Sequence, residues 1–459
     1  MDKLEKLRPV GLLEKFSTAR HPLGFYYNVA LAASYTLPES FTLPLKDYIY
    51  KATETLINQH PILSAIPVDE ETNDPYFARL PEIDLSQQIL FQKRSVSPTD
   101  IDEPDTELQS LLQEQHAIGF KNPLPYWRLL ILTDDAKDKP FTAVFVYHHA
   151  IGDGGSGKAF HRTFLEALRG AASLKPDEAQ QIVASPDTPL LPNLEAAHPL
   201  PLSFSYLMKL LFKEKIYTKQ DRALWTAATI RSPLTTHLRL IALSAAQTSA
   251  LLKLCRQNNT TVTCAVQTVI ARATFPHLPE EYARVMCSGA ISSRKWLPEV
   301  INDDSMGVWV QEFAEIYSRN AVTGGSFPWA EAKRSRKTIT KELRLKGKNT
   351  SVGLLKFVHD FSKYLMEDRL GKPRRASYEV SSLGVVKTEN PEDASLPQMG
   401  RVIFSQSASV TGSAFEVSVI TGPDGCLAMG ISWQAEILED DLMLAVIESL
   451  KKELNELCI

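Results

Sequence analysis

Two adjacent histidines, followed by an aspartate between glycines, are the residues of this chain best suited to chemistry. They belong to the run His148-His149-Ala150-Ile151-Gly152-Asp153-Gly154. Histidine has an unperturbed pKa near neutrality, so a fixed imidazole can take up and return a proton at working pH. A histidine pair alone is also common as a structural feature or a fragment of a metal site. The complete HHxxxDG pattern at the end of a strand is much rarer by chance, and we interpret it as catalytic.

The segments on either side of the motif would hold it in place. Residues 141–147 (FTAVFVY) are rich in β-branched and aromatic residues, which predicts a buried strand. Residues 158–168 carry apolar side chains at three- and four-residue steps, which predicts a helix. A strand–turn–helix unit of this kind places the motif at the carboxyl end of a strand, where sites in α/β proteins commonly form.

The local geometry of the motif limits what its residues can do together. Side chains alternate across a strand, so His148 and His149 are expected to point to opposite faces and cannot share one site. Gly152 and Gly154 are expected to allow a tight turn and a close approach of the backbone.

The motif and several further segments resemble a known group of enzymes. HHxxxDG is similar to the motif of the chloramphenicol acetyltransferase-like superfamily of acyl-CoA-dependent acyltransferases, which includes the peptide-synthetase condensation domains. Within it, the chain resembles the fungal alcohol acetyltransferase family at residues 8–16, 23–29, 60–63, 125–129, 292–298, 381–384 and 431–434. These marks cover essentially the whole chain. The Asp-Phe-Gly-Trp-Gly motif of the plant branch is absent, which disfavours that branch.

The resemblance implies an α/β fold of two chloramphenicol acetyltransferase-like domains. Each would be a mixed sheet covered by helices, with the active-site tunnel at their interface. A chain of 459 residues is too long for one core and fits two domains of about 200 residues. We expect an N-terminal domain with the motif over 1–184, a Pro-rich crossover linker and apolar helix over 185–222, and a C-terminal domain over 223–459.

The resemblance also implies roles for individual residues. His149 would be the general base that removes the proton from the acceptor, and His148 would support it. Asp153 would point away from the site and pair with an arginine that braces the loop. Arg294 lies in the matching segment and is the expected partner.

The remaining site residues are expected in the second half of the chain. A polar run and a neighbouring segment could supply an oxyanion stabiliser or acceptor contacts. The candidates are Ser405, Gln406, Ser407, Ser409, Thr411 and Ser413, with Tyr378 and Ser382. The phosphates of CoA require basic groups, for which we favour Lys372, Arg374 and Arg375 over the cluster at 333–341. A solvated surface is the alternative for both clusters.

Composition excludes several other classes of function. A net charge of -4 gives no reason to expect a nucleic-acid partner. Five cysteines without CxxC or zinc-like spacing indicate reduced thiols and no metal site. GxGxxG, Walker and HExxH patterns are absent, which disfavours dehydrogenases, P-loop enzymes and zinc proteases. With no signal peptide and no spanning segment apparent, we expect a cytoplasmic monomer.

One apolar segment leaves its role open. Residues 202–213 (LSFSYLMKLLFK) follow the proline-rich stretch. They could line a pocket, rest peripherally on a membrane surface, or pack as a covering helix, and we favour a helix facing the core.

We therefore predict an O-acyltransferase with no resident cofactor. It would move an acetyl group from its co-substrate acetyl-CoA to the hydroxyl of a small-molecule alcohol, directly in a ternary complex. The acceptor could be a precursor of a volatile ester or a secondary metabolite. An N-acyltransferase or condensation-type amide-forming enzyme is the nearer alternative, because it would use the same base. A non-catalytic binding protein of the same fold is the other.

Overall fold

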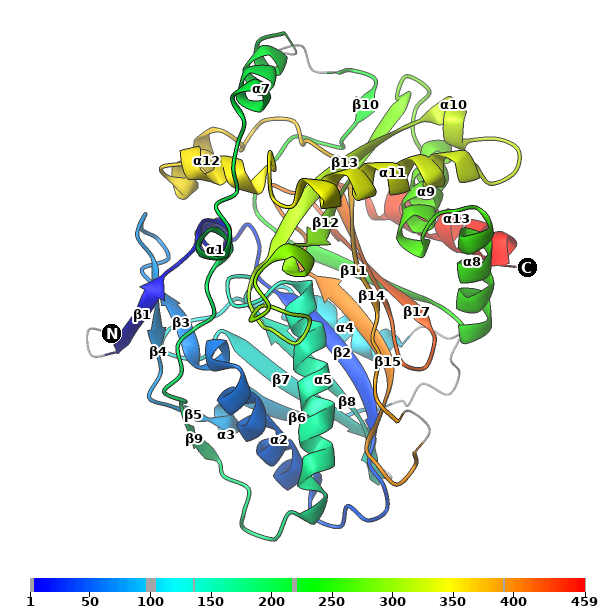
Figure 1. The fold of residues 1–459 in the computed structure, drawn as a ribbon. Coiled ribbons are helices and arrows are strands. Elements are labelled where there is room, and N and C mark those ends of the chain that lie inside the picture. Colours follow the sequence, from blue (N-terminus) through cyan, green and yellow to red (C-terminus); the bar gives the residue numbers. More distant parts are fainter. Residues whose placement is uncertain (1–3, 96–104, 135–136, 217–220, 391–392, 459) are drawn as a thin grey trace.

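Two mixed sheets, one built mainly from each half of the chain, form the frame of the protein (Figure 1). The computed structural model describes residues 4–95, 105–134, 137–216, 221–390 and 393–458. Helices cover the outer faces of both sheets, and the two halves meet along the middle of the molecule (Figure 1). The α/β class and the arrangement in two halves agree with the expectation from the sequence.

The first sheet holds the predicted motif strand near its centre. Its strand order is β15 (Gln398–Gln406), β2 (Val29–Thr36), β8 (Lys137–Tyr147), β7 (Trp127–Asp134) and β6 (Ile89–Lys93). β8 pairs antiparallel with β2 and β7. Residues 143–147 are all fully buried, so this part of the strand is covered on both faces. That explains why its sequence is continuously apolar instead of alternating.

Two helices pack on one face of this sheet (Figure 1). They are α2 (Leu45–Gln59) and α5 (Gly154–Gly170), which lie side by side and contact each other. α5 contains the predicted helix 158–168, which is confirmed. Phe160 and Phe164 are fully buried, and the ring of Phe160 stacks on that of Phe145 in β8.

The second sheet combines parallel and antiparallel pairs. Its order is β10 (Leu224–Trp225), β12 (Arg284–Ser292), β14 (Tyr378–Val385), β16 (Phe415–Thr421), β17 (Leu427–Gln434) and β11 (Thr236–Leu243), with β13 (Val310–Ser318) paired to β12. It is covered by α8 (Ala245–Gln257), α9 (Val262–Thr274), α11 (Trp329–Leu345) and α13 (Asp440–Cys458). β16 and β17 form an antiparallel hairpin, and α8 begins at a capping box made by Ser244 and Gln247.

The smaller elements connect these two sheets or lie at their edges. Short strands are β1 (Glu5–Pro9), β3 (Ala65–Val68), β4 (Tyr76–Arg79), β5 (Glu82–Asp84) and β9 (Ile182–Ala184). The other helices are α1 (Leu12–Arg20), α3 (Leu85–Gln88), α4 (Thr106–Gln115), α6 (Leu194–Ala197), α7 (Phe204–Ile216), α10 (Arg319–Val322) and α12 (Phe361–Glu367). Short 3-10 helices include η4 (Arg294–Trp296) and η5 (Val352–Phe357).

One strand crosses between the halves. β15 belongs by sequence to the range 223–459, but it pairs antiparallel with β2 of the first sheet, with Gln406 opposite Val29. It also packs against β17, where a Cβ on Gly430 would lie 2.5 Å from the carbonyl oxygen of Phe404. Glycine at 430 permits this close approach. The crossing brings the residues that follow β15 to the junction of the halves.

Helix α7 does not face the core, so that expectation was wrong. The helix projects from the body of the protein (Figure 1), and Phe204, Leu211 and Phe212 are 78%, 53% and 58% exposed. Its start is tied to the body, since the backbone N–H of Ser203 donates to Asn349 Oδ1 at 2.7 Å. The rest of the segment leads away from that anchor. In the part of the chain that the structure describes, no helix has the length and apolar character needed to cross a membrane.

Candidate functional site

The motif forms the loop that joins β8 to α5. β8 ends at Tyr147, and the N–H of His148 donates to the carbonyl of Tyr126 at 2.9 Å. A turn follows, closed by the N–H of Ile151 donating to the carbonyl of His148 at 3.1 Å. Asp153 then caps α5, because its Oδ1 accepts from the N–H of Ser156 at 3.1 Å. The predicted strand–turn–helix unit is confirmed.

The motif glycines serve packing and not a special backbone conformation. Neither Gly152 nor Gly154 is among the residues with positive φ. A Cβ on Gly152 would lie 2.7 Å from Ser156 Cβ, and one on Gly154 would lie 2.7 Å from Leu383 Cδ2. The expected close approach is therefore present at both positions. A side chain would be harder to accommodate at Gly152, because Ser156 Cβ is fixed to the first turn of α5 whereas the end of the Leu383 side chain can move.

The structure pairs Asp153 with Arg294, the partner expected from the sequence. Arg294 Nη1 and Nη2 each donate at 2.8 Å, to Oδ2 and Oδ1 respectively, and the backbone N–H of Trp309 donates to Oδ2 at 3.0 Å. Burial would raise the pKa of Asp153, but the charge and hydrogen bonds of Arg294 outweigh it, and this pKa lies below its ordinary value. The hydrogen bonds of this carboxylate fix the loop to the second half of the chain.

His148 points into the first half, away from His149. Its ring lies 4.6 Å from that of His21 and 5.2 Å from that of Tyr126, measured between centroids. Its Nδ1 accepts the N–H of Ala150 at 3.0 Å, so the proton of the neutral ring is on Nε2, 3.5 Å from Glu70 Oε1. Burial lowers the pKa of His148 well below its ordinary value, which keeps the ring neutral.

His21, Glu70 and His148 bring three potential metal-ligating atoms within 4.8 Å of one another. The hydrogen bonds do not suit a metal ion. His21 Nε2 accepts the N–H of Phe120 at 3.0 Å, so its Nδ1 carries a proton and donates to Glu70 at 3.1 Å. The hydroxyl of Tyr126 also donates to Glu70, at 2.9 Å. A metal-bound histidine needs its other ring nitrogen as a donor, but in both rings that nitrogen accepts from the backbone. We call the group the His–Glu–His cluster, in which His21 is hydrogen-bonded to Glu70 and His148 Nε2 lies 3.5 Å from the other oxygen of that carboxylate.

His149 faces a cavity of about 480 Å³ between the two halves. The cavity is lined by polar and by apolar side chains. The polar ones include Arg20, Tyr26, Glu379, Gln406 and Glu416, and the apolar ones include Leu13, Phe16, Val352, Leu355, Val358 and Leu365. The ring of Tyr26 lies 5.8 Å from that of His149, and its hydroxyl donates to Gln406 Oε1 at 3.2 Å. The cavity thus joins the motif to the segment that follows β15.

The surroundings of His149 keep its imidazole neutral. Burial lowers its pKa to about 4, and the charge of Arg20 adds to this effect. Its own backbone carbonyl and the carboxylate of Asp153 act in the opposite direction. The Nδ1 atom is buried and has no hydrogen-bond partner on another described residue. At neutral pH the ring is therefore an unprotonated base directed at a cavity.

Buried ionisable side chains line the same cavity, and they were not predicted from the sequence. The guanidinium of Arg20 lies between the rings of Phe16 and Tyr26, 4.4 and 4.3 Å from their centroids. Burial raises the pKa of Glu379 to about 7, with a further contribution from Glu312. Burial also raises the pKa of Glu416 well above its ordinary value, assisted by Glu379. Each glutamate interrupts an apolar strand pattern, which is the signal that could have identified it.

Only part of the polar run at residues 405–413 lines the cavity. Gln406, Ser409, Thr411 and Ser413 line the cavity. Ser405 and Ser407 do not line it. The hydroxyl of Ser405 is bonded to His116 Nε2 at 2.8 Å, and that of Ser407 accepts the N–H of Tyr27 at 3.1 Å.

Tyr378 and Ser382 are not brought to His149. The hydroxyl of Tyr378 donates to the carbonyl of Gln267 at 2.7 Å, within the core of the second half. Ser382 accepts from the hydroxyl of Thr263 at 3.0 Å. The alternation of β14 explains Tyr378, because it turns Glu379 towards the cavity and its neighbour away.

The three basic residues favoured for CoA lie in different environments. Arg374 is buried, and its guanidinium donates to the carbonyl of Gly412 at 3.0 Å and to Gln434 Oε1 at 2.9 Å. It braces the loop after β15 and is not among the residues that line the cavity, so the expectation that it binds the phosphates of CoA was wrong. Lys372 is exposed, with Asp368 3.9 Å away. Arg375 lines the cavity.

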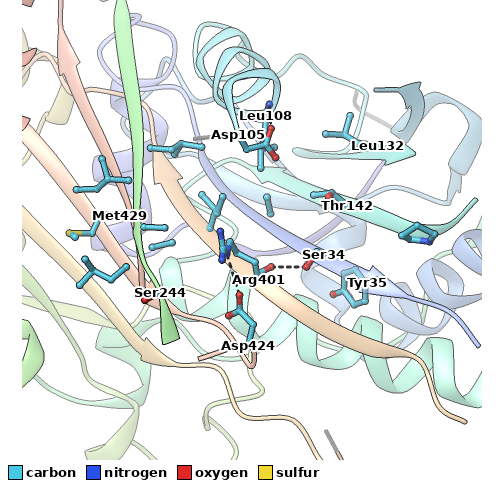
Figure 2. A pocket seen from close by; sticks show the side chains of 18 of the residues that line it. Ser34, Tyr35, Asp105, Leu108, Leu132, Thr142, Ser244, Arg401, Asp424 and Met429 are labelled. Carbon is cyan, nitrogen blue, oxygen red and sulfur yellow. Dashed lines mark hydrogen bonds and ion pairs between the residues drawn. The ribbon is translucent and has the colours of Figure 1, made fainter. Parts of the chain in front are cut away.

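A larger cavity of about 1220 Å³ lies between the first sheet and the strands β11 and β17 (Figure 2). The residues of the motif do not line it. Two ion pairs lie in its wall, with Arg401 Nε 3.2 Å from Asp424 Oδ2 and Arg94 bonded to Asp105. The described features that suit acyl-transfer chemistry gather in the smaller cavity.

The sequence matches an alcohol acetyltransferase family model and two proteins described as probable alcohol acetyltransferases. Residues 9–454 match the family model described as alcohol acetyltransferase. The chain is 37% identical over 465 residues to the probable alcohol acetyltransferase crmB of Aspergillus fumigatus, covering 96% of this chain and 98% of that protein. It is 25% identical to the probable alcohol acetyltransferase FCK4 of Fusarium pseudograminearum, covering 97% and 94%.

Solved structures with the same fold extend over the whole chain. TRI3 trichothecene 15-O-acetyltransferase from Fusarium sporotrichioides superposes with a TM-score of 0.74 at 16% identity, covering 98% of this chain and 95% of that one. The epimerization domain from the third module of tyrocidine synthetase B superposes with a TM-score of 0.63 at 14% identity, covering 99% and 97%. These likenesses show the fold. The family match, which runs almost from end to end, shows that the chain belongs to the alcohol acetyltransferase family.

Proposed function

We propose that this protein transfers an acetyl group from acetyl-CoA to the hydroxyl of a small-molecule alcohol, with His149 as the general base. Membership of an acetyltransferase family implies an acyl-CoA donor and an alcohol acceptor. The observation that carries the proposal is the neutral imidazole of His149 at the wall of the cavity between the halves. TRI3 is described as an acetyltransferase of a trichothecene, and we propose a secondary metabolite as the acceptor here too.

The reaction would proceed in one ternary complex. His149 takes the proton of the acceptor hydroxyl while the oxygen attacks the thioester carbonyl, which forms a tetrahedral intermediate. The intermediate collapses, the C–S bond breaks, and the thiolate of CoA receives the proton from the imidazolium. An alcohol is scarcely ionised near neutral pH, so a positioned base contributes about 10²–10⁴-fold to the rate.

The other motif residues would keep His149 in position. Asp153 and Arg294 fix the loop to the second half, and the His–Glu–His cluster holds the adjacent residue, His148. Asp153 acts through the loop, because its hydrogen bonds go to Arg294, Ser156 and the backbone of Trp309. It is therefore a positioning residue and not an orienting partner of the base.

A panel of acceptors tests the proposal. Purified protein would be offered labelled acetyl-CoA with matched pairs of alcohols and amines, and free thiol release and product mass would be measured. We expect ester products. His149→Ala should abolish transfer with a normal melting temperature, whereas His359→Ala, which changes an exposed histidine, should retain it. Amide products would favour the condensation-type alternative, and transfer by His149→Ala would reject the assigned base.

A further inference from the structure

The polar wall of the cavity contains side-chain atoms that lack partners. Ser409 Oγ, Thr411 Oγ1 and Glu416 Oε2 are buried and have no hydrogen-bond partner among the described residues. The three residues are only 4%, 8% and 3% exposed, and all three line the cavity together with His149. An unpaired buried polar group costs about 1–3 kcal/mol, so such groups rarely gather without a ligand or water to bind.

The loop that carries the two hydroxyls, those of Ser409 and Thr411, is held in place by two arginines. The buried guanidinium of Arg374 donates to the carbonyls of Ser409, Gly412 and Ser413 at 3.2, 3.0 and 3.3 Å. Arg369 donates to the carbonyl of Thr411 at 3.2 Å. With their carbonyls fixed in this way, the hydroxyls of Ser409 and Thr411 are positioned in advance for a ligand.

The loop also lies close to the buried carboxyl group. A Cβ on Gly412 would lie 2.8 Å from Glu416 Oε1, so glycine permits this approach. As a result, two hydroxyls and one carboxyl group form a single polar patch, which we call the hydroxyl-loop patch (Ser409, Thr411 and Glu416). The patch offers both donors and acceptors.

Ionisable groups of both signs surround the hydroxyl-loop patch. Burial and the nearby Glu379 raise the pKa of Glu416 well above its ordinary value, which favours the neutral form of this carboxyl group. The pKa of Glu379 is raised to about 7, and Arg20 supplies an opposing positive charge in the same wall. Arg369, Arg375 and Glu312 also line the cavity, so charged groups of both signs surround a patch of hydrogen-bonding atoms. Hydroxyl groups can pair with such atoms as donors and as acceptors.

A simple aliphatic alcohol would not use this wall. Its chain could lie against the apolar side at Phe16, Leu355 and Val358, but it would displace water from the hydroxyl-loop patch without replacing the lost hydrogen bonds. A second hydroxyl on the acceptor would replace them. The same argument disfavours any acceptor whose reacting hydroxyl is its one polar group.

We propose that the acceptor is a diol or polyol, and that the hydroxyl-loop patch binds a hydroxyl other than the one that His149 deprotonates. This inference rests on the proposed acetyl transfer to an alcohol and narrows its acceptor class. The patch acts in recognition, while the base acts on the reacting oxygen.

Matched acceptors and variants test the inference. The kcat/KM of the wild-type protein would be measured with 1-hexanol against 1,2-hexanediol, and with cyclohexanol against trans-1,2-cyclohexanediol. We expect the diol of at least one pair to be preferred about tenfold or more. Thr411→Val and Ser409→Ala each remove one hydroxyl, and each should lower the ratio of diol to monohydric kcat/KM about three- to tenfold. Ser110→Ala, on the exposed face of α4, should leave the ratio unchanged.

A binding measurement separates this inference from the proposed function. The melting temperature would be recorded with each alcohol, and stabilisation by the diol should weaken in Thr411→Val. Equal use of diol and monohydric alcohol by the wild-type protein, or a ratio unchanged in both hydroxyl variants, would overturn the inference and leave acetyl transfer intact. Stabilisation by diols without transfer to any alcohol would overturn the proposed function alone. If no diol stabilises the protein and no diol is preferred as an acceptor, the inference is overturned.

Discussion

His148 and His149 are neighbours in the chain, yet their rings lie on opposite sides of the motif loop. His148 stacks edge-on against His21 inside the first half, and His149 lies beside Tyr26 at the cavity. One motif thus supplies both an anchor and a reactive group.

Glu70 should stabilise the anchor as a hydrogen-bond acceptor. Glu70→Gln replaces one acceptor oxygen by an NH2 group that would face a ring N–H, so we expect the free energy of unfolding to fall by about 1–3 kcal/mol. Urea unfolding measures this. Glu367→Gln, in an exposed pair with Lys363, is the control and should change stability by less than about 1 kcal/mol.

A chelator should have no effect on the same cluster. Because the ring nitrogens that face Glu70 carry protons, we expect neither the melting temperature nor the activity to change after incubation with EDTA. Differential scanning fluorimetry before and after dialysis checks this. A melting temperature that fell with EDTA and recovered with Zn²⁺ would show that the cluster binds metal.

Removing one partner of the buried Asp153–Arg294 ion pair should lower the free energy of unfolding strongly. Asp153→Asn leaves the Arg294 guanidinium buried without its counter-charge, so we expect a loss of about 3–5 kcal/mol in the free energy of unfolding. Arg294→Met should cost a similar amount, and the double variant should cost less than the sum. Chemical unfolding of all three proteins measures the coupling. Additive losses would contradict direct pairing.

The pH dependence of catalysis should follow the lowered pKa of His149. The base acts when unprotonated, and its pKa is about 4, so kcat/KM should stay nearly constant from pH 7 down to about 5 and fall below that. An unperturbed imidazole would lose activity near pH 6.5. Initial rates under subsaturating acceptor provide the profile, with unfolding monitored at each pH. A midpoint near 6.5 would rule out the environment described for this ring.

Stability should fall on acidification because other buried histidines resist protonation. Burial lowers the pKa of His60 and of His161 to about 4. Between about pH 6.5 and 4 the unfolded chain binds protons at these rings and the folded protein does not. Their contribution is therefore complete above pH 6.5 and is lost as the pH falls, by up to about 1.4 kcal/mol per pH unit for each ring. Urea unfolding at pH 7, 6 and 5 should show the free energy of unfolding falling with pH. From this slope, His161→Gln should take up about one proton fewer on unfolding than His359→Gln.

Much of the motif region could be predicted from sequence because its structure is local. The strand at 141–147, the turn and the helix after it follow from apolar spacing and glycines over some thirty residues, and the structure has all three. The choice of Arg294 as the partner of Asp153 came from resemblance, since no local pattern links two residues 141 positions apart.

The parts that could not be predicted depend on distant pairing. β15 joins β2, so that Gln406 meets Tyr26 across 380 positions of the chain. Nothing in the composition of β15 tells which sheet it enters. Glu416 likewise becomes a cavity residue only once β16 is placed beside β14. The exposure of α7 also escaped prediction, because an apolar segment in a folded protein is most often covered.

The crossing of β15 also sets how substrates can reach His149. β15 is hydrogen-bonded to β2 and packs against β17, so it links the two sheets directly. An opening of the cavity by separation of the halves would have to disrupt either this packing or the β15–β2 hydrogen bonds.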